Sequence, residues 1–203
     1  MKVIDFQNPE CRKILEDGYV LSFPTETVYG VGVRFDSEEA YERLCKAKNR
    51  RPDKAIAVMC SDTFNLDEFF EISDGAKKVV EYFLPGPLTC LVKARDNAPY
   101  QTHLGTYVAG IRIPEKKELL EFLKTLPFAL QVTSANMSGQ PSLDDFESVY
   151  KVFKDSEEVK GIVKGTCQSG TPTTVVDLTK DKPIVIRQGE ITLKQIEEVF
   201  YNK

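Results

Sequence analysis

The chain has 203 residues, of which 41% are hydrophobic and 29% charged, and its formal net charge is −4. This composition is typical of a globular protein and predicts one domain over residues 1–203. No run approaches the ~18 apolar residues of a membrane span, and the N-terminus turns acidic at Asp5, too early for a signal peptide. We therefore expect a cytoplasmic protein without a membrane partner, and the acidic balance disfavours nucleic-acid binding driven by bulk charge.

Helix and strand signals interleave along the whole chain, and Asn8-Pro9, Ser37 and Thr192 mark helix starts. The predicted helices span 9–17, 38–48, 74–83, 115–124, 143–154 and 193–201. The predicted strands span 19–23, 55–60, 88–92, 108–113, 128–132, 175–178 and 183–187. Because the order lacks strict βαβ repetition, we expect an α/β fold with a mixed sheet rather than a purely parallel one.

Cysteine and histidine are too few and too scattered for metal or disulfide chemistry. The five cysteines never form a C-x-x-C pair, which argues against a disulfide framework and a structural zinc site. The single histidine, His103, lies among polar residues and is expected in a loop. Chemistry in this chain must therefore depend on lysine, arginine, hydroxyl and carboxylate groups, and no protein metal site is predicted.

The segment 22–32 is the most informative part of the sequence. An apolar strand runs into Thr25, Glu26, Thr27 and Tyr29 and is followed by two glycines. Proline and glycine also mark ordinary turns, but an ordinary turn does not require these four polar side chains. In open α/β folds, ligands bind at the carboxyl ends of strands, so this pattern favours a binding site.

A cluster of basic residues follows the second predicted helix. Lys46, Lys48, Arg50, Arg51 and Lys54 fall within nine residues of an otherwise acidic chain. One or two cations at a helix C-terminus would be a simple cap. Lys48, Arg50 and Lys54 around a proline-interrupted turn instead favour binding of a polyanion, and a triphosphate suits such a cluster. The P-loop and Rossmann motifs are both absent from the sequence.

Further polar groups lie near the ends of later strands. Ser134 and Asn136 follow the strand at 128–132 and suit hydrogen bonds to phosphate, although serine and asparagine also cap helices. Ser142 is a candidate cap of the helix at 143–154. Arg112 ends an apolar strand, where it either pairs with an internal acid or receives an anionic ligand. Thr173, Thr174 and Arg187 add hydroxyls and a cation.

Seven segments, in order, resemble the YrdC/Sua5 family of L-threonylcarbamoyladenylate synthases. They are PTETVYG at 24–30, Lys48-x-Arg50 with Asp53-Lys54, PGPLT at 85–89, RIP at 112–114, SANMSG at 134–139, TTVVD at 173–177 and Arg187-x-Gly189. The resemblance implies a YrdC-like fold, a twisted mixed β-sheet with flanking helices around a large concave basic cavity. It also implies the single-domain form of the family.

The resemblance implies an enzyme that joins L-threonine, bicarbonate and ATP into threonylcarbamoyl-AMP and releases pyrophosphate. Mg²⁺ would accompany the ATP, held largely by the phosphates. A downstream transferase complex would then move the threonylcarbamoyl group onto tRNA, giving N6-threonylcarbamoyladenosine (t6A).

Site residues are carried over by position. The implied ATP-binding residues are Lys48, Arg50, Lys54, Ser134, Asn136, Ser142 and Arg187, with Lys48 and Arg50 also the catalytic residues. The implied threonine-binding residues are Thr27, Arg112 and Thr173, with Arg112 on the substrate carboxylate. The chain departs from the family pattern at Arg51, where proline is usual, and at Met59, where histidine is common.

Two alternatives use the same fold differently. One is a non-catalytic module that binds double-stranded RNA or tRNA in the basic concavity. The hydroxyls of Thr27, Ser134 and Thr173 distinguish this alternative from the synthase. Binding of a duplex backbone requires lysines and arginines spread over a surface and does not require these hydroxyls. The other is an ATP-dependent carbamoyl-transfer domain acting on carbamoyl phosphate, which the short chain disfavours.

Overall fold

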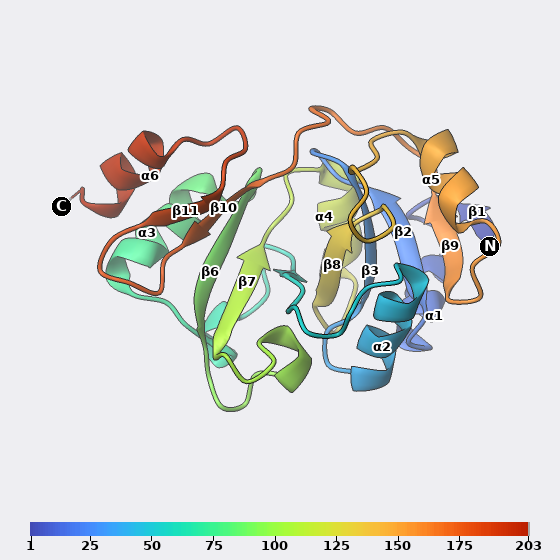
Figure 1. The fold of residues 1–203 in the computed structure, drawn as a ribbon, viewed down its shortest axis with the longest axis horizontal. Helices are drawn as coiled ribbons and strands as arrows, with labels where there is room; N and C mark the ends of the chain where they lie inside the picture. The colour runs from blue at the N-terminus through green and yellow to red at the C-terminus, as the bar shows by residue number, and fades with distance from the viewer. Residues whose placement is uncertain (203) are drawn as a thin grey trace.

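The computed structural model describes residues 1–202, and its centre is one eleven-stranded sheet (Figure 1). Its strands are β1 (Lys2–Ile4), β2 (Val20–Pro24), β3 (Tyr29–Arg34), β4 (Val58–Met59), β5 (Phe70–Glu71), β6 (Leu88–Ala94), β7 (Val108–Arg112), β8 (Leu130–Ser134), β9 (Val159–Val163), β10 (Thr174–Asp177) and β11 (Ile184–Arg187). The spatial order is β1-β9-β2-β3-β8-β4-β7-β6-β10-β11, and β5 pairs with β6. Four neighbouring pairs are parallel and the others antiparallel, so the prediction of a mixed sheet is confirmed.

Six α-helices and two short 3-10 helices flank the sheet among residues 1–202. They are α1 (Pro9–Glu16), α2 (Glu38–Ala47), α3 (Asp74–Phe83), α4 (Lys117–Lys124), α5 (Phe146–Phe153), α6 (Leu193–Phe200), η1 (Leu66–Glu68) and η2 (Tyr100–Thr102). The caps predicted at Asn8, Ser37 and Thr192 are confirmed, because each side chain accepts a hydrogen bond from a main-chain N–H of its first turn. The cap of α5, however, is Asp145 and not Ser142, since the Asp145 carboxylate accepts from Ser148 N.

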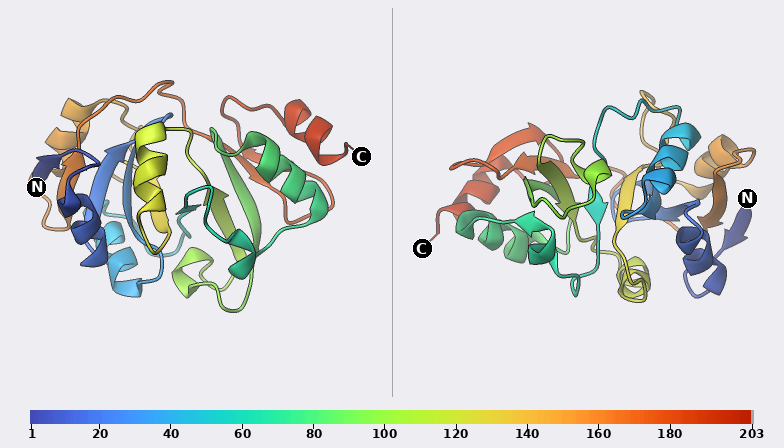
Figure 2. Two further views of the ribbon diagram at one scale, coloured as in Figure 1. Left: turned by 180° about the vertical axis from the view of Figure 1, so that it is seen from behind. Right: turned by 90° about the horizontal axis from the view of Figure 1, so that it is seen from below.

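The helices cover the two faces of the sheet unevenly. Helices α1, α3, α4 and α6 contribute apolar side chains to the larger hydrophobic core on one face, seen from behind in Figure 2. Helices α2 and α5 pack on the opposite face, over β2, β3 and β9. On that second face no α-helix of the described chain covers β6, β7 and β10, and the short helix η2 lies beside β7 (Figures 1 and 2). The cavity described below lies over these strands.

Strand periodicity separates core from cavity in β6 and β7. Leu88, Cys90 and Val92 of β6 belong to the hydrophobic core, whereas Thr89 and Leu91 line the cavity described below. Likewise, Ala109 and Ile111 of β7 are core residues, and Val108, Gly110 and Arg112 face the cavity. Successive side chains of a strand point to opposite faces of the sheet. Each of these strands therefore has an apolar row that faces the core and a row of polar and apolar residues that faces the cavity.

Several strands differ from the sequence prediction. The run at 55–60 pairs only at Val58–Met59, although it is central as expected. Residues 25–28 form a loop, and the two glycines that follow lie in strand β3, which was not predicted. Gly30 and Gly32 allow close packing there, because a Cβ on either would lie 2.9 Å from a Val132 methyl group. Strands β1, β5 and β9 were also not predicted. His103 follows η2 in a loop as expected, but it is buried.

Candidate active site

A cavity of about 540 Å³ lies over β3, β8, β4, β7, β6 and β10. The predicted site residues in its wall are Thr27, Arg50, Arg112, Ser134, Ser142, Thr173 and Arg187. Within the described chain, this wall contains three arginines and no aspartate or glutamate. Guanidinium groups and hydroxyls donate hydrogen bonds, so the wall suits anionic ligands such as carboxylates and phosphates.

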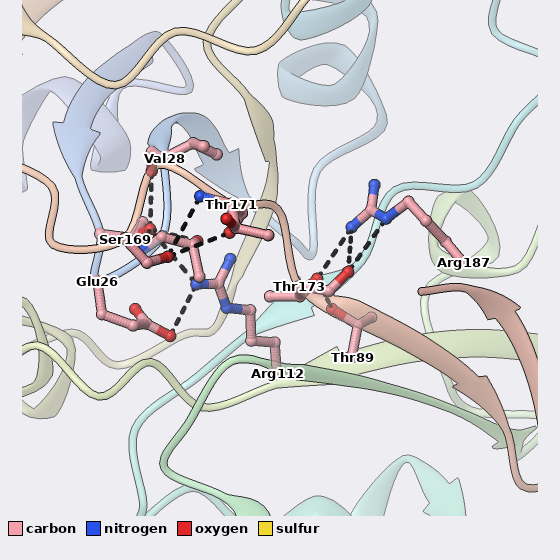
Figure 3. A network of polar contacts seen from close by, with 10 residues as sticks. Glu26, Val28, Thr89, Arg112, Ser169, Thr171, Thr173 and Arg187 are labelled. Atoms are coloured by element: carbon pink, nitrogen blue, oxygen red, sulfur yellow. Dashed lines mark hydrogen bonds and ion pairs between the residues drawn. The ribbon is translucent and has the colours of Figure 1, made fainter. Parts of the chain in front are cut away.

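Arg112 is held by the loop that joins β2 to β3 (Figure 3). Its Nη2 donates to Glu26 Oε1 at 2.8 Å, to Thr27 Oγ1 at 2.9 Å and to Thr25 Oγ1 at 3.3 Å. Both members of the Arg112–Glu26 ion pair are largely buried. Arg112 therefore meets an internal acid and also faces the cavity, which combines the two possibilities left open by the sequence. Arg112 Nε and Glu26 Oε2 are buried without a hydrogen-bond partner.

Residues 164–173, here called the crossing segment, hold the loop between β2 and β3 in place. It runs from β9 to β10 across the molecule (Figure 1). The main-chain N–H groups of Gln168 and Ser169 donate to Glu26 O at 3.1 Å, and that of Gly170 donates to Thr27 O at 2.9 Å. These bonds hold the Thr25–Thr27 hydroxyls against Arg112. Sequence reasoning singled out Thr173 at the end of this segment but missed the role of Gln168, Ser169 and Gly170, which act through main-chain groups.

Arg187 lies in a second polar group, together with Thr173 and Thr89 (Figure 3). Its Nε and Nη2 donate to Thr173 O at 3.1 and 2.8 Å, and Nη2 also donates to Thr173 Oγ1 at 3.0 Å. The hydroxyls of Thr173 and Thr89 are 2.9 Å apart. Burial, with a smaller contribution from the positive charge of Arg112, lowers the pKa of Arg187 below its ordinary value. Thr89 was quoted within a motif, but sequence reasoning gave it no role.

Lys48 lies behind the cavity wall rather than in it. Its side chain is 2% exposed, and its ammonium group donates to the main-chain oxygens of Ser134 and of Asn136, the latter at 2.6 Å. In return, Ser138 N donates to Lys48 O at 2.9 Å. Burial, aided by the nearby charge of Arg50, lowers the pKa of Lys48 to about 8.

Asn136 holds its own loop and also lies outside the cavity wall. Its Nδ2 donates to Met137 O and Gln140 O, and its Oδ1 accepts from Ser134 Oγ at 2.5 Å. With two donors and one acceptor occupied, this amide orients the loop that presents the Ser134 hydroxyl. The structure therefore separates Ser134, which faces the cavity, from the residues that fix its position.

Of the basic cluster in residues 46–54, the cavity wall contains Arg50. Arg50 lines the cavity and its Nη2 donates to Lys54 O and Ala55 O at 3.1 and 3.4 Å, which shapes the turn. The Lys54 side chain is exposed and lies outside the wall. Met59, by contrast, is a buried part of the wall and the register neighbour of Arg112 in the sheet.

Among residues 1–202, no group of three or more His, Cys, Asp or Glu side chains is placed to hold a metal ion. No helix in the same range has the length and apolar character needed to cross a bilayer.

Known proteins share both the fold and the motifs of this chain. A putative threonylcarbamoyl-AMP synthase of Methanocaldococcus jannaschii is 30% identical, and the match covers 97% of this chain and 95% of that protein. A threonylcarbamoyl-AMP synthase of Bacillus subtilis is 31% identical over 97% of this chain, which spans only 57% of its length. The crystal structure of Sua5 from P. abyssi in complex with L-threonine superposes with a TM-score of 0.90 at 27% identity, covering 98% of this chain and 61% of that one.

The family model named Sua5_yciO_yrdC and described as "Telomere recombination" matches residues 13–189, which contain every residue of the cavity wall. The mixed sheet with flanking helices, expected from the resemblance, is confirmed by these structural matches. The family model and the M. jannaschii relative, each matching most of the chain, show that the chain belongs to the Sua5/YciO/YrdC family.

Proposed function

We propose that this chain is a threonylcarbamoyl-AMP synthase, which makes threonylcarbamoyl-AMP and pyrophosphate from L-threonine, bicarbonate and ATP. One observation carries the proposal: among residues 1–202, the cavity wall has three arginines, several hydroxyls and no carboxylate. All three substrates of the reaction are anions or carry a carboxylate, and such a wall suits them. The names of the M. jannaschii and B. subtilis relatives, and the L-threonine in the P. abyssi structure, support the same reading.

In this proposal Arg112 receives the carboxylate of threonine. Its Nη2 already bonds Glu26 and two threonine hydroxyls, which fixes the plane of the guanidinium group. Thr27 lies beside it in the wall, and Thr173 lies at the neighbouring strand end. A guanidinium group held in this way loses little conformational entropy when a carboxylate binds.

The ATP phosphates are assigned to the other end of the cavity. Arg50, Ser134 and Ser142 supply a cation and two hydroxyls from that part of the wall. Lys48 and Asn136 support the same loop from behind, and we retain Lys54 as an ATP contact made from the exposed edge of the turn. We assign the positioning of the reacting groups to Lys48 and Arg50.

The reaction requires positioning and charge neutralisation more than a strong base. The threonine amine attacks the carbon of bicarbonate, an N–C bond forms, and the departing hydroxide leaves with an amine proton as water. A carbamate oxygen then attacks the α-phosphorus of ATP, the bond to the β-phosphate oxygen breaks, and pyrophosphate leaves. The arginines would offset the negative charge gathered at these steps.

Mg²⁺ would enter with ATP. The described part of the wall offers hydroxyls and no carboxylate, so phosphate oxygens of ATP would hold most of the cation's coordination sphere. The product is consumed by a transferase that modifies tRNA to t6A, and that complex is the proposed downstream partner.

The test is pyrophosphate release from ATP by the purified chain, with L-threonine and bicarbonate each present or absent. We expect release only when both are present, together with a product mass equal to threonylcarbamoyl-AMP. Release without threonine would indicate hydrolysis of ATP to AMP and pyrophosphate. A folded protein that binds ATP but releases no pyrophosphate would contradict the proposed synthase activity. It would favour the alternative function, binding of double-stranded RNA or tRNA.

A further inference from the structure

Tyr29 begins β3 directly after the loop that holds Arg112, and its phenol is engaged on the far side of β2. Its side chain is fully buried, and its hydroxyl lies 3.2 Å from Val163 O and 2.9 Å from Gly165 O. Because β2 lies between β3 and β9 in the sheet, the ring spans a neighbouring strand to reach the end of β9. The single phenol proton is therefore used where the crossing segment begins, although Tyr29 belongs to the cavity wall.

The two ends of the loop between β2 and β3 both contact Gly165. Before the loop, Pro24 packs so closely that a Cβ on Gly165 would lie 2.8 Å from Pro24 Cγ. After the loop, the Tyr29 hydroxyl donates to Gly165 O. In the middle of the loop, Glu26 O and Thr27 O accept the three main-chain N–H groups of the crossing segment described above. The loop is therefore attached to the crossing segment at both of its ends and in its middle.

The loop has internal hydrogen bonds as well, but these do not place it against Arg112. Thr25 Oγ1 accepts from Thr27 N at 3.1 Å and donates to Val28 O at 2.7 Å, which shapes the turn. Arg112 ends β7, and β8 and β4 lie between β7 and β3 in the sheet. Because β3 and β7 are not neighbours in the sheet of residues 1–202, the position of Thr27 beside Arg112 depends on the crossing segment and on the Arg112 side chain itself.

The crossing segment is held at its other end as well. It runs from Ser169 to Thr173, which lies beside Arg187 (Figure 3). There Arg187 donates to Thr173 O, and β10 follows directly and pairs with β6. Gly165 and Thr173 are therefore two anchors of the segment, and the Tyr29 hydroxyl supplies the buried hydrogen bond at the first.

We propose that Tyr29 is a positioning residue for the binding of threonine. Its phenol fixes Gly165, the crossing segment then holds the loop, and the loop sets the Thr27 hydroxyl against Arg112, where the threonine carboxylate is proposed to bind. The inference rests on the proposed function and deepens it, because it names a residue that acts on one substrate without touching it.

The effect of the phenol is expected to be confined to threonine. The main-chain N–H of Tyr29 donates to Leu143 O at 2.9 Å, and its main-chain oxygen accepts from Ala135 N at 2.7 Å. These two bonds tie β3 to the loops that carry Ser142 and Ser134, which are assigned to ATP. They do not use the phenol and remain in a phenylalanine variant, so the contacts with ATP should be kept.

Steady-state pyrophosphate release by Tyr29→Phe tests the inference, with L-threonine and ATP varied in turn. The substitution keeps the ring and removes the hydroxyl. We expect the KM for L-threonine to rise by about threefold to tenfold, which is the effect of one hydrogen bond, while kcat and the KM for ATP change less than about twofold. Tyr41→Phe is the matched control, because Tyr41 is buried in the same hydrophobic core and its hydroxyl lies 3.5 Å from Lys54 O rather than near the crossing segment. It should leave the KM for L-threonine unchanged.

Amide hydrogen exchange gives a readout that needs no turnover. The N–H groups of Gln168, Ser169 and Gly170 donate to the loop, so their exchange reports whether the crossing segment stays attached. We expect these three amides to exchange at least about threefold faster in Tyr29→Phe, and at the wild-type rate in Tyr41→Phe.

Gly165→Ala disturbs the same junction from the other side, because its Cβ would press on Pro24. We expect this variant also to raise the KM for L-threonine. Combined with Tyr29→Phe, it should raise that KM by less than the product of the two single factors, since both changes release one anchor. Circular dichroism and thermal unfolding check that each variant is folded, and the comparison of Tyr29→Phe with Tyr41→Phe does not depend on Gly165→Ala.

The outcomes are separable. KM values for threonine and ATP that rise together in Tyr29→Phe, or an equal rise in the threonine KM of Tyr41→Phe, would show a general loss of stability and overturn the inference. Faster exchange with an unchanged KM for L-threonine would overturn it as well, because the crossing segment would then not position the site. Failure of the wild-type protein to release pyrophosphate would instead remove the proposed function. Titration calorimetry with L-threonine then tests Tyr29 alone: equal dissociation constants for wild type and Tyr29→Phe, or no binding by the wild type, would contradict its role.

Discussion

The ammonium group of Lys48 lies 2.6 Å from the main-chain oxygen of Asn136 and also donates to the main-chain oxygen of Ser134. A buried lysine in this position ties the end of α2 to the loop after β8. The same two segments are linked again by the bond from Ser138 N to Lys48 O. Lys48 thus helps to fix the positions of Ser134 and Arg50, both of which line the cavity.

Substitution of Lys48 tests this link. Lys48→Met keeps most of the side-chain volume but leaves the two carbonyls without their charged donor. We expect kcat/KM for ATP to fall at least about tenfold, because a charge-assisted hydrogen bond contributes ~1.5–3 kcal/mol. The readout is pyrophosphate release at varied ATP. Lys46→Met is the control, since Lys46 is exposed and pairs with Glu158 away from the cavity. Equal activity of both variants would contradict the role of Lys48.

Burial of Lys48 also predicts a pH-dependent stability difference. The pKa of Lys48 is about 8 in the folded protein and 10.5 in the reference state. Between these values the unfolded chain binds more protons, so the Lys48 contribution to the free energy of unfolding rises with pH. The stability of wild type minus that of Lys48→Met should therefore increase from pH 8 to 10.5 by at most ~1.4 kcal/mol per pH unit. Urea unfolding of both proteins at several pH values measures it.

Cysteine ionisation is common to the two proteins and cancels in this difference. Burial raises the pKa values of Cys60 and Cys90 to about 12, which lowers the stability of both proteins alike at high pH. A stability difference that stays constant from pH 7 to 10 would show that Lys48 titrates normally.

Arg112 is predicted to control the use of threonine. Arg112→Lys retains a positive charge but lacks the planar guanidinium group, so it cannot reproduce the contacts of Nη2 with Glu26 and the two threonine hydroxyls. We expect the KM for L-threonine to rise about tenfold or more, with a much smaller change in the KM for ATP. Pyrophosphate release at varied threonine provides the measurement. If both KM values rise by the same factor, Arg112 does not contact threonine.

Ser142 lines the cavity, whereas Asp145 caps helix α5, so substitutions of the two residues should have different effects. Asp145→Ala removes the acceptor of Ser148 N and should lower the free energy of unfolding by about 1 kcal/mol. Ser142→Ala should leave stability within about 0.5 kcal/mol and raise the KM for ATP, because Ser142 faces the cavity and caps no helix. Thermal unfolding and steady-state kinetics on both variants test the pair. Loss of stability in Ser142→Ala without a kinetic change would reverse the assignment.

The sequence determined what depends on local chemistry. Caps at Asn8, Ser37 and Thr192 were readable because a polar side chain before an apolar helical pattern bonds the free N–H groups of its own first turn. The motifs that support family membership were readable for a similar reason, since contiguous residues carry them. The mixed sheet followed from the order of elements alone.

The tertiary structure decided which of the polar residues share the cavity. The sequence shows Lys48 and Arg50 two positions apart, but only packing puts the first behind the wall and the second in it. The pairing of β10 with β6 brings Thr173 within 2.9 Å of Thr89 across 84 residues of chain, and β11 then delivers Arg187 to both. Strand registers of this kind are set by long-range burial rather than by local preference. For that reason the sequence could name the residues of the site. Only the fold shows which of them line the cavity, which hold a loop from behind, and which pair with a charged neighbour.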